Sequence, residues 1–261
     1  MEEEIQIRDD ETLEDLQLGG LRLIQKKTGF RFGMDAVLLA DFAAIRENDI
    51  VADFGTGSGI LPVLLAGRGK GRVYYAIDIQ EEMAETAGRN LALNRLEGKA
   101  ICLDLSEASD LFPKCSLDAV ICNPPYGEPR AALVSPDRNR AISRNQQEGV
   151  LDGFLRNAFE WLKGRGKISL VYPAASMFSM MIALRKHHLE PKRFRLVYPA
   201  ADKNANLVLI EAVKDAKPTL HPMPPLIIYE KNGDLTTELK SIYHIREAGD
   251  NRLRSVRTGF C

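Results

Sequence analysis

The sequence predicts an α/β protein with a seven-stranded, mostly parallel sheet and an antiparallel pair of strands at one edge. Between residues 50 and 187, short apolar segments alternate with segments of helical apolar spacing, a pattern typical of parallel sheets covered by helices. The last two apolar segments, 193–198 and 206–213, have no helical stretch between them, so we expect them to pair antiparallel. A glycine-rich segment follows the first strand of this region.

A small hairpin and a helix precede the alternating region. Leucines flank Gly19-Gly20, which is a turn signal, and together they predict a hairpin over 12–32. Residues 34–44 have the composition of a helix. We therefore predict an N-terminal hairpin-helix unit, 1–44, that packs on the core.

The alternating region is expected to supply five strands and four helices. The predicted strands are 50–54, 73–79, 100–105, 117–122 and 167–172. The predicted helices are 59–67, 81–94, 149–163 and 176–187. Helix 149–163, for example, has an apolar residue at every fourth position from Val150 to Leu162.

Beyond the antiparallel pair the composition changes. Four prolines within 215–226 predict a stiff, extended connector. A short strand at 226–229 and a helix at 234–243 follow it. The core domain is thus expected to span 45–244, and the basic segment 245–261 to form a mobile tail.

Length and composition are those of an ordinary globular protein of 261 residues, with 45% apolar and 27% charged residues. No apolar run approaches 18 residues and the acidic N-terminus has no signal core, so we expect a cytoplasmic protein without a membrane segment. The four cysteines have no metal-ligand spacing, so neither a metal site nor disulfides are expected. They are Cys102, Cys115, Cys122 and Cys261.

The glycine-rich segment predicts a nucleotide-binding loop. It runs Asp53-Phe54-Gly55-Thr56-Gly57-Ser58-Gly59, between a predicted strand and a predicted helix. Asp78 ends the next strand, where a carboxylate can accept hydrogen bonds from both hydroxyls of a ribose. A tight turn with a capping aspartate is the alternative reading of the loop.

The glycine spacing indicates which nucleotide binds. The third glycine comes one residue earlier than in the dinucleotide pattern, and this spacing resembles that of S-adenosylmethionine-dependent methyltransferases. Asp104, after the third strand, also fits them, because an acidic residue there often binds the adenine amino group. The neighbouring Ile79 and Leu105 are assigned to the same pocket.

Asn123-Pro124-Pro125-Tyr126 follows the fourth strand and resembles the signature of methyltransferases that act on planar amino nitrogens. Such a nitrogen is a poor nucleophile, because its lone pair is conjugated. The Asn123 side-chain oxygen and the Pro124 carbonyl can hold its two N–H groups and stabilise the charge that develops on it. Tyr126 offers a face on which a base can stack. We assign Asn123, Pro124 and Tyr126 to catalysis, with Asn123 also touching the donor.

Several further segments resemble the bacterial tRNA1(Val) adenine-N6 methyltransferase family. They are Phe30-Arg31-Phe32-Gly33-Met34-Asp35-Ala36-Val37-Leu38-Leu39-Ala40, Ala141-Ile142-Ser143-Arg144, Ala205-Asn206-Leu207-Val208-Leu209 and Pro224-Pro225-Leu226-Ile227-Ile228-Tyr229. The resemblance implies a Rossmann-like class I methyltransferase fold, S-adenosylmethionine as cofactor and N6-methylation of an adenine in tRNA. It also implies that Phe32 and Asp35 help to cover the donor.

Basic side chains point to an RNA partner. The loop 127–147 carries four arginines that could hold phosphates or stack on bases: Arg130, Arg138, Arg140 and Arg144. Solvated surface is the alternative reading for each, and the sequence does not indicate an oligomeric state.

Other functions remain open at this point. A protein glutamine N5-methyltransferase shares the Asn-Pro-Pro-Tyr motif, but such enzymes usually have a larger N-terminal helical domain. A methyltransferase acting on another RNA, or a non-catalytic RNA-binding protein with a retained donor pocket, would also carry these motifs. A nicotinamide dehydrogenase is disfavoured by the glycine spacing and by the lack of evident hydride-transfer residues.

Overall fold

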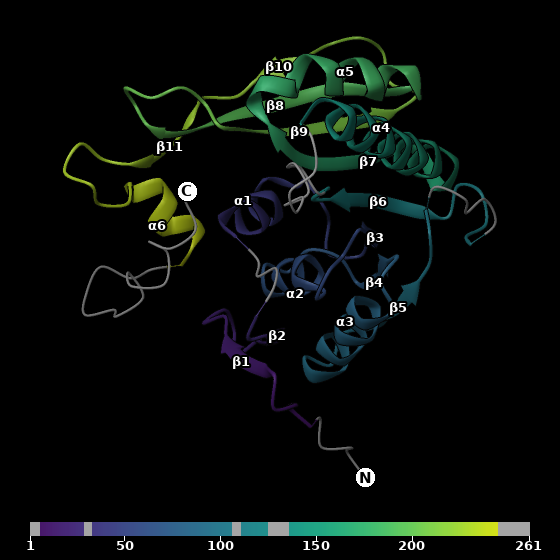
Figure 1. The fold of residues 1–261 in the computed structure, drawn as a ribbon, viewed down its shortest axis with the longest axis vertical. Helices are drawn as coiled ribbons and strands as arrows, with labels where there is room; N and C mark the ends of the chain where they lie inside the picture. Colours follow the sequence, from purple (N-terminus) through teal and green to yellow (C-terminus); the bar gives the residue numbers. More distant parts are fainter. Residues whose placement is uncertain (1–5, 29–32, 106–110, 125–135, 245–261) are drawn as a thin grey trace.

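The computed structural model describes residues 6–28, 33–105, 111–124 and 136–244, with the side chains of 136–148 left out (Figure 1). Within these ranges the main sheet has nine strands, in the order β10-β8-β9-β7-β6-β3-β4-β5, with β11 also pairing with β8. The strands are β3 (Ile50–Phe54), β4 (Val73–Asp78), β5 (Gly98–Cys102), β6 (Leu117–Cys122), β7 (Leu162–Pro173), β8 (Leu189–Ala200), β9 (Leu207–Lys214), β10 (His221–Pro222) and β11 (Leu226–Tyr229).

The seven predicted strands form the body of this sheet, as expected. β3, β4, β5, β6 and β7 are parallel, and β9 runs antiparallel between β7 and β8. The predicted antiparallel pair is β8 and β9, but the sheet has nine strands rather than the predicted seven. Strands β10 and β11 extend it by pairing parallel to β8, with Leu226 opposite Val197. The outer edge of β8 would otherwise present unpaired N–H and C=O groups, and the extended segment after β9 satisfies them.

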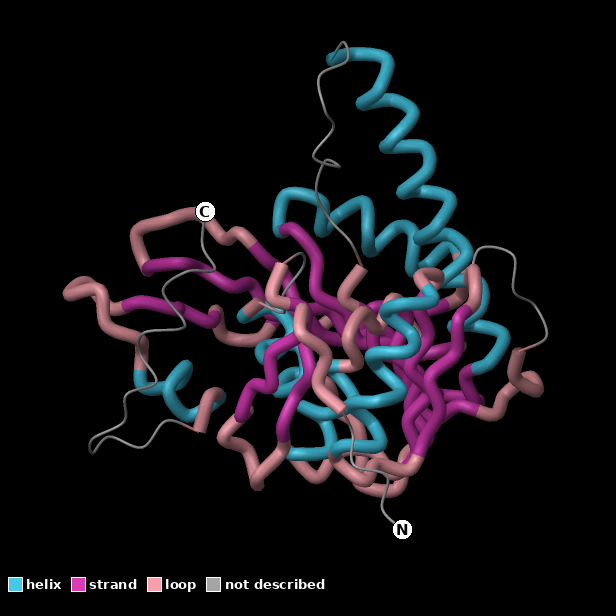
Figure 2. Tube along the Cα trace, turned by 60° about the horizontal axis from the view of Figure 1, so that its bottom comes forward, coloured by secondary structure: helices cyan, strands magenta, loops and turns pink. Residues whose placement is uncertain are grey.

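Helices cover both faces of the sheet (Figure 2). The helices are α1 (Met34–Phe42), α2 (Ile60–Gly67), α3 (Glu81–Leu93), α4 (Pro136–Trp161), α5 (Met177–Lys186) and α6 (Thr237–Ile242), with a 3-10 turn, η1 (Ala174–Ser176). Helix α4 begins at Pro136, before the predicted residue 149. The prediction began too late because apolar spacing starts only at Val150 and the preceding segment is polar.

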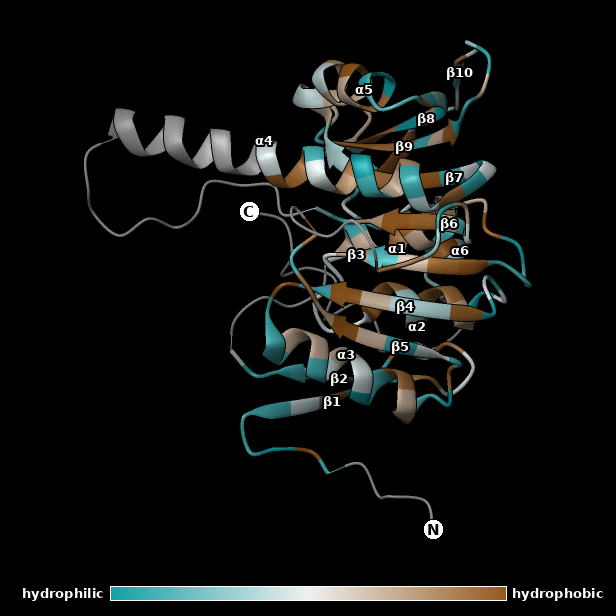
Figure 3. Cartoon of the chain, turned by 90° about the vertical axis from the view of Figure 1, so that its right-hand side faces the viewer, coloured by the Kyte–Doolittle hydropathy of each residue, from teal (hydrophilic) through white to brown (hydrophobic). Residues whose placement is uncertain are grey.

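Strand alternation divides the core into two layers. Val51 of β3 packs with α1, α2 and α6 on one face, whereas Ala52 faces α4 and α5 on the other. Most residues of the central strands β3, β4 and β6 are apolar (Figure 3), although each strand contains one aspartate. Trp161, fully buried, meets the rings of Phe54 and Phe112 edge-on, with centroids 5.8 and 5.1 Å apart.

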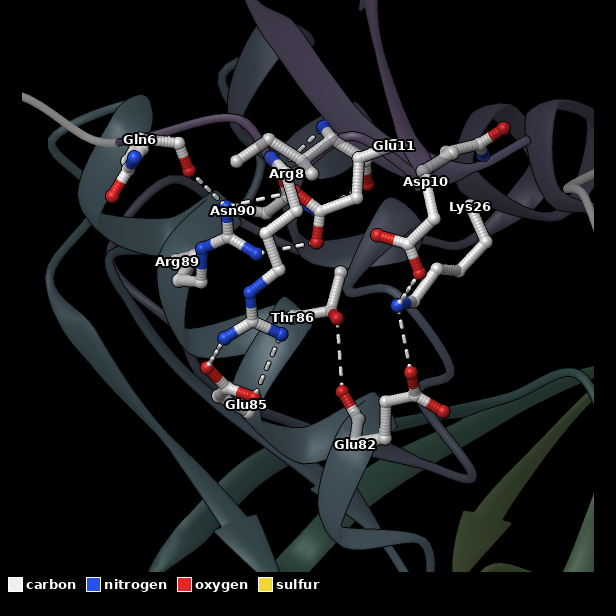
Figure 4. A network of polar contacts seen from close by, with 12 residues as sticks. Gln6, Arg8, Asp10, Glu11, Lys26, Glu82, Glu85, Thr86, Arg89 and Asn90 are labelled. Carbon is white, nitrogen blue, oxygen red and sulfur yellow. Dashed lines mark hydrogen bonds and ion pairs between the residues drawn. The ribbon is translucent and has the colours of Figure 1, made fainter.

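The N-terminal hairpin, β1 (Glu11–Asp15) and β2 (Arg22–Lys26), docks on α3 through polar contacts (Figure 4). Glu11 is buried and accepts two hydrogen bonds from the guanidinium of Arg89, at 2.5 and 2.9 Å. This guanidinium lowers the pKa of the Glu11 carboxyl. Lys26 bridges Asp10 and Glu82, at 2.5 and 2.7 Å.

Asn90 of α3 and Asn94, which caps the carboxyl end of that helix, bind the backbone of β2. The Asn90 amide accepts from the Ile24 N–H (2.7 Å) and donates to the Ile24 carbonyl (2.9 Å). Asn94, one turn later, makes the same pair of bonds to Arg22, at 2.9 and 2.7 Å. The two side chains thus bond to β2 as the peptide groups of a neighbouring strand would.

None of the helices in the part of the chain that the structure describes is both long and apolar enough to span a membrane. No group of histidine, cysteine, aspartate and glutamate side chains within that part has the arrangement of a metal site.

Candidate active site

The sequence motifs meet at one edge of the sheet. Strands β6, β3, β4 and β5 are neighbours and run parallel, so their carboxyl ends lie side by side. The glycine loop follows β3, Asp78 ends β4, Asp104 follows β5, and Asn123 follows β6. This is the edge at which open α/β sheets bind their ligands.

The glycine loop depends on backbone conformations that glycine adopts without strain. Gly55, Gly57 and Gly59 all have positive φ, at +70, +56 and +80°. A Cβ on Gly59 would lie 3.1 Å from both the Cα and the Cβ of Ala87, so the third glycine lets α2 approach α3 closely. A Cβ on Gly57 would meet no described atom within 4 Å, which leaves space beside that residue.

Asp78 is held rigidly beside this loop. Its carboxylate accepts one hydrogen bond from the Gly57 N–H (2.8 Å) and one from the Gln80 N–H (2.9 Å). Each oxygen therefore keeps a second lone pair for a ligand hydroxyl. Ile79, directly after Asp78, has 62% of its surface exposed, although it is a large apolar side chain.

The two predicted residues after β5 differ in their surroundings. Asp104 is half-buried. The Leu105 side chain packs in the core, and its carbonyl accepts a hydrogen bond from the amide of buried Asn157 at 2.6 Å. β5 ends at Cys102, before both residues, rather than at the predicted residue 105.

Asp53, in β3, is a buried carboxyl with an unsatisfied atom. Its Oδ2 accepts from the Thr56 hydroxyl at 2.5 Å, whereas no described residue bonds its Oδ1. Burial, together with the nearby charge of Asp78, raises the pKa of Asp53 to about 7. An orphaned acceptor of this kind fits a cationic ligand group.

Asn123 and Pro124 follow β6, and the structure brings Asn123 to the start of α1. The Asn123 amide donates to the Asp35 carboxylate at 3.2 Å, and Pro124 is buried. Phe32, Tyr126 and Arg130 lie outside the described residues. Arg138, Arg140 and Arg144 lie on α4, in the stretch whose side chains are not described.

One residue of this region was not predicted. Asn90 is fully buried, and besides its bonds to β2 its amide donates to the Ser58 carbonyl in the glycine loop, at 2.8 Å. A buried asparagine inside an amphipathic helix is the sequence signal that indicates such a contact. Asn90 therefore couples the hairpin to the loop.

The residues present fit S-adenosylmethionine. The open side of Gly57 admits a ligand close to the backbone, and Asp78 presents acceptors for a ribose. Exposed Ile79 provides an apolar surface for an adenine, and the unsatisfied Asp53 oxygen suits an ammonium group.

Comparisons with known proteins agree with this geometry. The methyltransferase small domain family matches residues 33–187. A tRNA1(Val) (adenine(37)-N6)-methyltransferase of Parabacteroides distasonis is 30% identical over 74% of this chain and 81% of its own length.

Two solved structures share the fold. The first is a predicted O-methyltransferase of Agrobacterium tumefaciens (TM-score 0.64, 23% identity), with 82% of this chain and 97% of that chain covered. The second is M. jannaschii TYW2 in complex with AdoMet (TM-score 0.53, 19% identity), with 79% and 86% covered.

Proposed function

Because the chain belongs to the methyltransferase small domain family and is therefore an S-adenosylmethionine-dependent methyltransferase, we propose that its acceptor is the N6 amino nitrogen of an adenine in tRNA. The observation that carries the proposal is the position of Asn123-Pro124, which follows β6 at the sheet edge that also holds the glycine loop. The activity for which the Parabacteroides relative is named supports the same acceptor.

In the proposed reaction the protein's work is to bind and to orient. S-adenosylmethionine supplies an electrophilic methyl group on a sulfonium. Gly57 and Asp78 form the donor side of the site. On the acceptor side, the Asn123 oxygen and the Pro124 carbonyl each accept a hydrogen bond from one N–H group of the target amine. This geometry favours a pyramidal nitrogen, whose lone pair is no longer conjugated with the ring and is directed towards the methyl group. The new N–C bond replaces the S–C bond, and the nitrogen then loses one proton to water.

The proposed acceptor requires that a base leave its stack. An adenine in structured RNA must be turned out before its amino group reaches the end of β6. Tyr126 provides the stacking face in this proposal, and the arginines at 130, 138, 140 and 144 hold the phosphates nearby.

The test is a methylation assay with a labelled donor. The protein is incubated with RNA, DNA or protein fractions from cells that lack it, and the labelled fraction is digested and its nucleosides separated. We expect label in tRNA as N6-methyladenosine. Label in protein as methylglutamine, or in another RNA, would refute the proposed acceptor.

The role of Asn123 needs a matched measurement. Asn123→Ala should keep the fold and the donor affinity but lose methyl transfer by roughly 10²–10³-fold, the scale for removing one preorganised polar group. If Asn123 only ends a strand, this variant would instead have a lower melting temperature and an unchanged rate per folded molecule.

A further inference from the structure

A single hydrogen bond joins the start of α1 to the acceptor motif. The Asn123 Nδ2 lies 3.2 Å from the Asp35 Oδ2, although the two residues are 88 positions apart in the sequence. Both side chains are half-buried. Asp35 thus contacts the acceptor motif, whereas the family resemblance implied that it helps to cover the donor.

The contact decides which end of the amide is presented to the acceptor. An ionised carboxylate accepts hydrogen bonds but donates none, so the Asn123 atom facing it must be the nitrogen. The oxygen lies on the other branch of the same planar amide. If the amide were reversed, two acceptor oxygens would face each other, and N–H groups would confront the N–H groups of the target amine.

We propose that Asp35 is a positioning residue that fixes the Asn123 amide with its oxygen towards the target amine. The proposal deepens the proposed function and rests on it for the identity of the amine. It gives the aspartate of the Phe-Gly-Met-Asp segment a role in the acceptor half of the reaction.

The fold holds Asp35 firmly enough for this role. Its Oδ1 accepts from the Ala36 N–H at 2.9 Å, and this leaves Oδ2 towards Asn123. The far end of α1 is fixed as well, because the Lys70 ammonium binds the carbonyls of Ala40 and Ala43 at 2.9 and 2.8 Å.

Tyr243, directly after α6, also lies near Asp35. The pKa of Tyr243, which follows α6, is raised by burial and then by the charge of Asp35. The Asp35 carboxylate thus lies near Tyr243 as well as in contact with Asn123.

The first experiment separates positioning from donor binding. In Asp35→Ala, single-turnover methyl transfer should fall by roughly 10- to 100-fold, less than for loss of a direct contact. Donor affinity, measured by calorimetry, should change by no more than about threefold. Asp41→Ala, an exposed aspartate on the same helix, is the matched control and should leave both values unchanged. A tenfold or greater loss of donor affinity in Asp35→Ala would overturn the proposal.

A double-mutant cycle tests whether Asp35 acts through Asn123. The variant with both Asp35→Ala and Asn123→Ala should be no slower than Asn123→Ala alone. If the rate losses of the two single variants multiply in the double variant, Asp35 acts independently of Asn123 and the inference is refuted.

Exchanging the carboxylate of Asp35 and the amide of Asn123 tests the assigned orientation through recovery of activity. Asn123→Asp alone places two carboxyls in contact and should be almost inactive. Adding Asp35→Asn restores one donor and one acceptor at the contact, and should raise the rate at least about tenfold. No recovery would count against the assigned orientation.

A final readout needs no acceptor, so it distinguishes failure of this inference from failure of the proposed function. The side-chain amide NMR signals of Asn123, identified by their loss in Asn123→Ala, should shift in Asp35→Ala and not in Asp41→Ala. If they shift while the wild-type protein methylates no tRNA, the proposed acceptor is wrong and the positioning role stands. If they do not shift, the positioning role is wrong.

Discussion

Gly59→Ala should destabilise the protein much more than Gly57→Ala, although both glycines belong to the same loop. Gly59 has φ of +80°, where a side chain costs about 1–2 kcal/mol. The added Cβ would also lie 3.1 Å from the backbone Cα of Ala87, and overpacking of this kind costs roughly 1–3 kcal/mol. The free energy of unfolding should therefore fall by about 2–5 kcal/mol.

Gly57→Ala is the matched control, because its φ is +56° but its Cβ would meet no described atom within 4 Å. It should lose only the conformational part, about 1–2 kcal/mol. The two free energies come from urea unfolding curves without donor. Calorimetry should show weaker donor binding for Gly57→Ala, because its new methyl group occupies the open side of the loop. Equal unfolding midpoints for the two variants would refute the close-packing argument.

Three other measurements test separate parts of the structure. Asp53 has its pKa raised from 3.8 to about 7, so its protonated form stabilises the fold at low pH and this contribution is lost as the pH rises towards and through 7. Between pH 5 and about 8, urea unfolding should therefore show a larger loss of stability for the wild-type protein than for Asp53→Asn; parallel pH profiles would contradict the assignment. Asn90→Ala leaves buried backbone groups of β2 and the Ser58 carbonyl without partners, so it should cost about 3 kcal/mol. Asn94→Ala, at the exposed equivalent contact, should cost about 1 kcal/mol or less, and similar losses would argue against the burial effect. Neutralising Arg138, Arg140 and Arg144 together should flatten the salt dependence of tRNA affinity, because fewer counterions are released. An unchanged slope would place these arginines outside the RNA interface.

The local parts of the fold could be predicted because local patterns determine them. The bounds of β3 and β6 agree with prediction, since each is a mostly apolar run that is followed within two residues by glycine or proline. The loop glycines and Asp78 were singled out by their spacing, and the structure brings them together, since the Gly57 N–H donates to the Asp78 carboxylate.

The features that could not be predicted depend on distant parts of the chain. The contact between Asp35 and Asn123 joins residues 88 positions apart, and those of Asn90 with Ile24 join residues 66 apart. Neither contact produces a periodic pattern in the sequence. Strand β10 was missed, and the strand predicted at 226–229, which is β11, was not expected to join the main sheet. Both pairings with β8 depend on the open side of a strand more than 20 residues away in the sequence.

Asn90 and Asn94 also bear on the association of one molecule of this protein with another. A two-stranded ribbon has two open sides, and each is a template on which another chain can add a strand. Asn90 and Asn94 occupy the outward N–H and C=O groups of Ile24 and Arg22. These side-chain amides occupy the positions on Arg22 and Ile24 at which a strand from a second molecule would have to bond. We therefore expect the four hydrogen bonds that hold the hairpin to disfavour strand addition at this part of β2 as well.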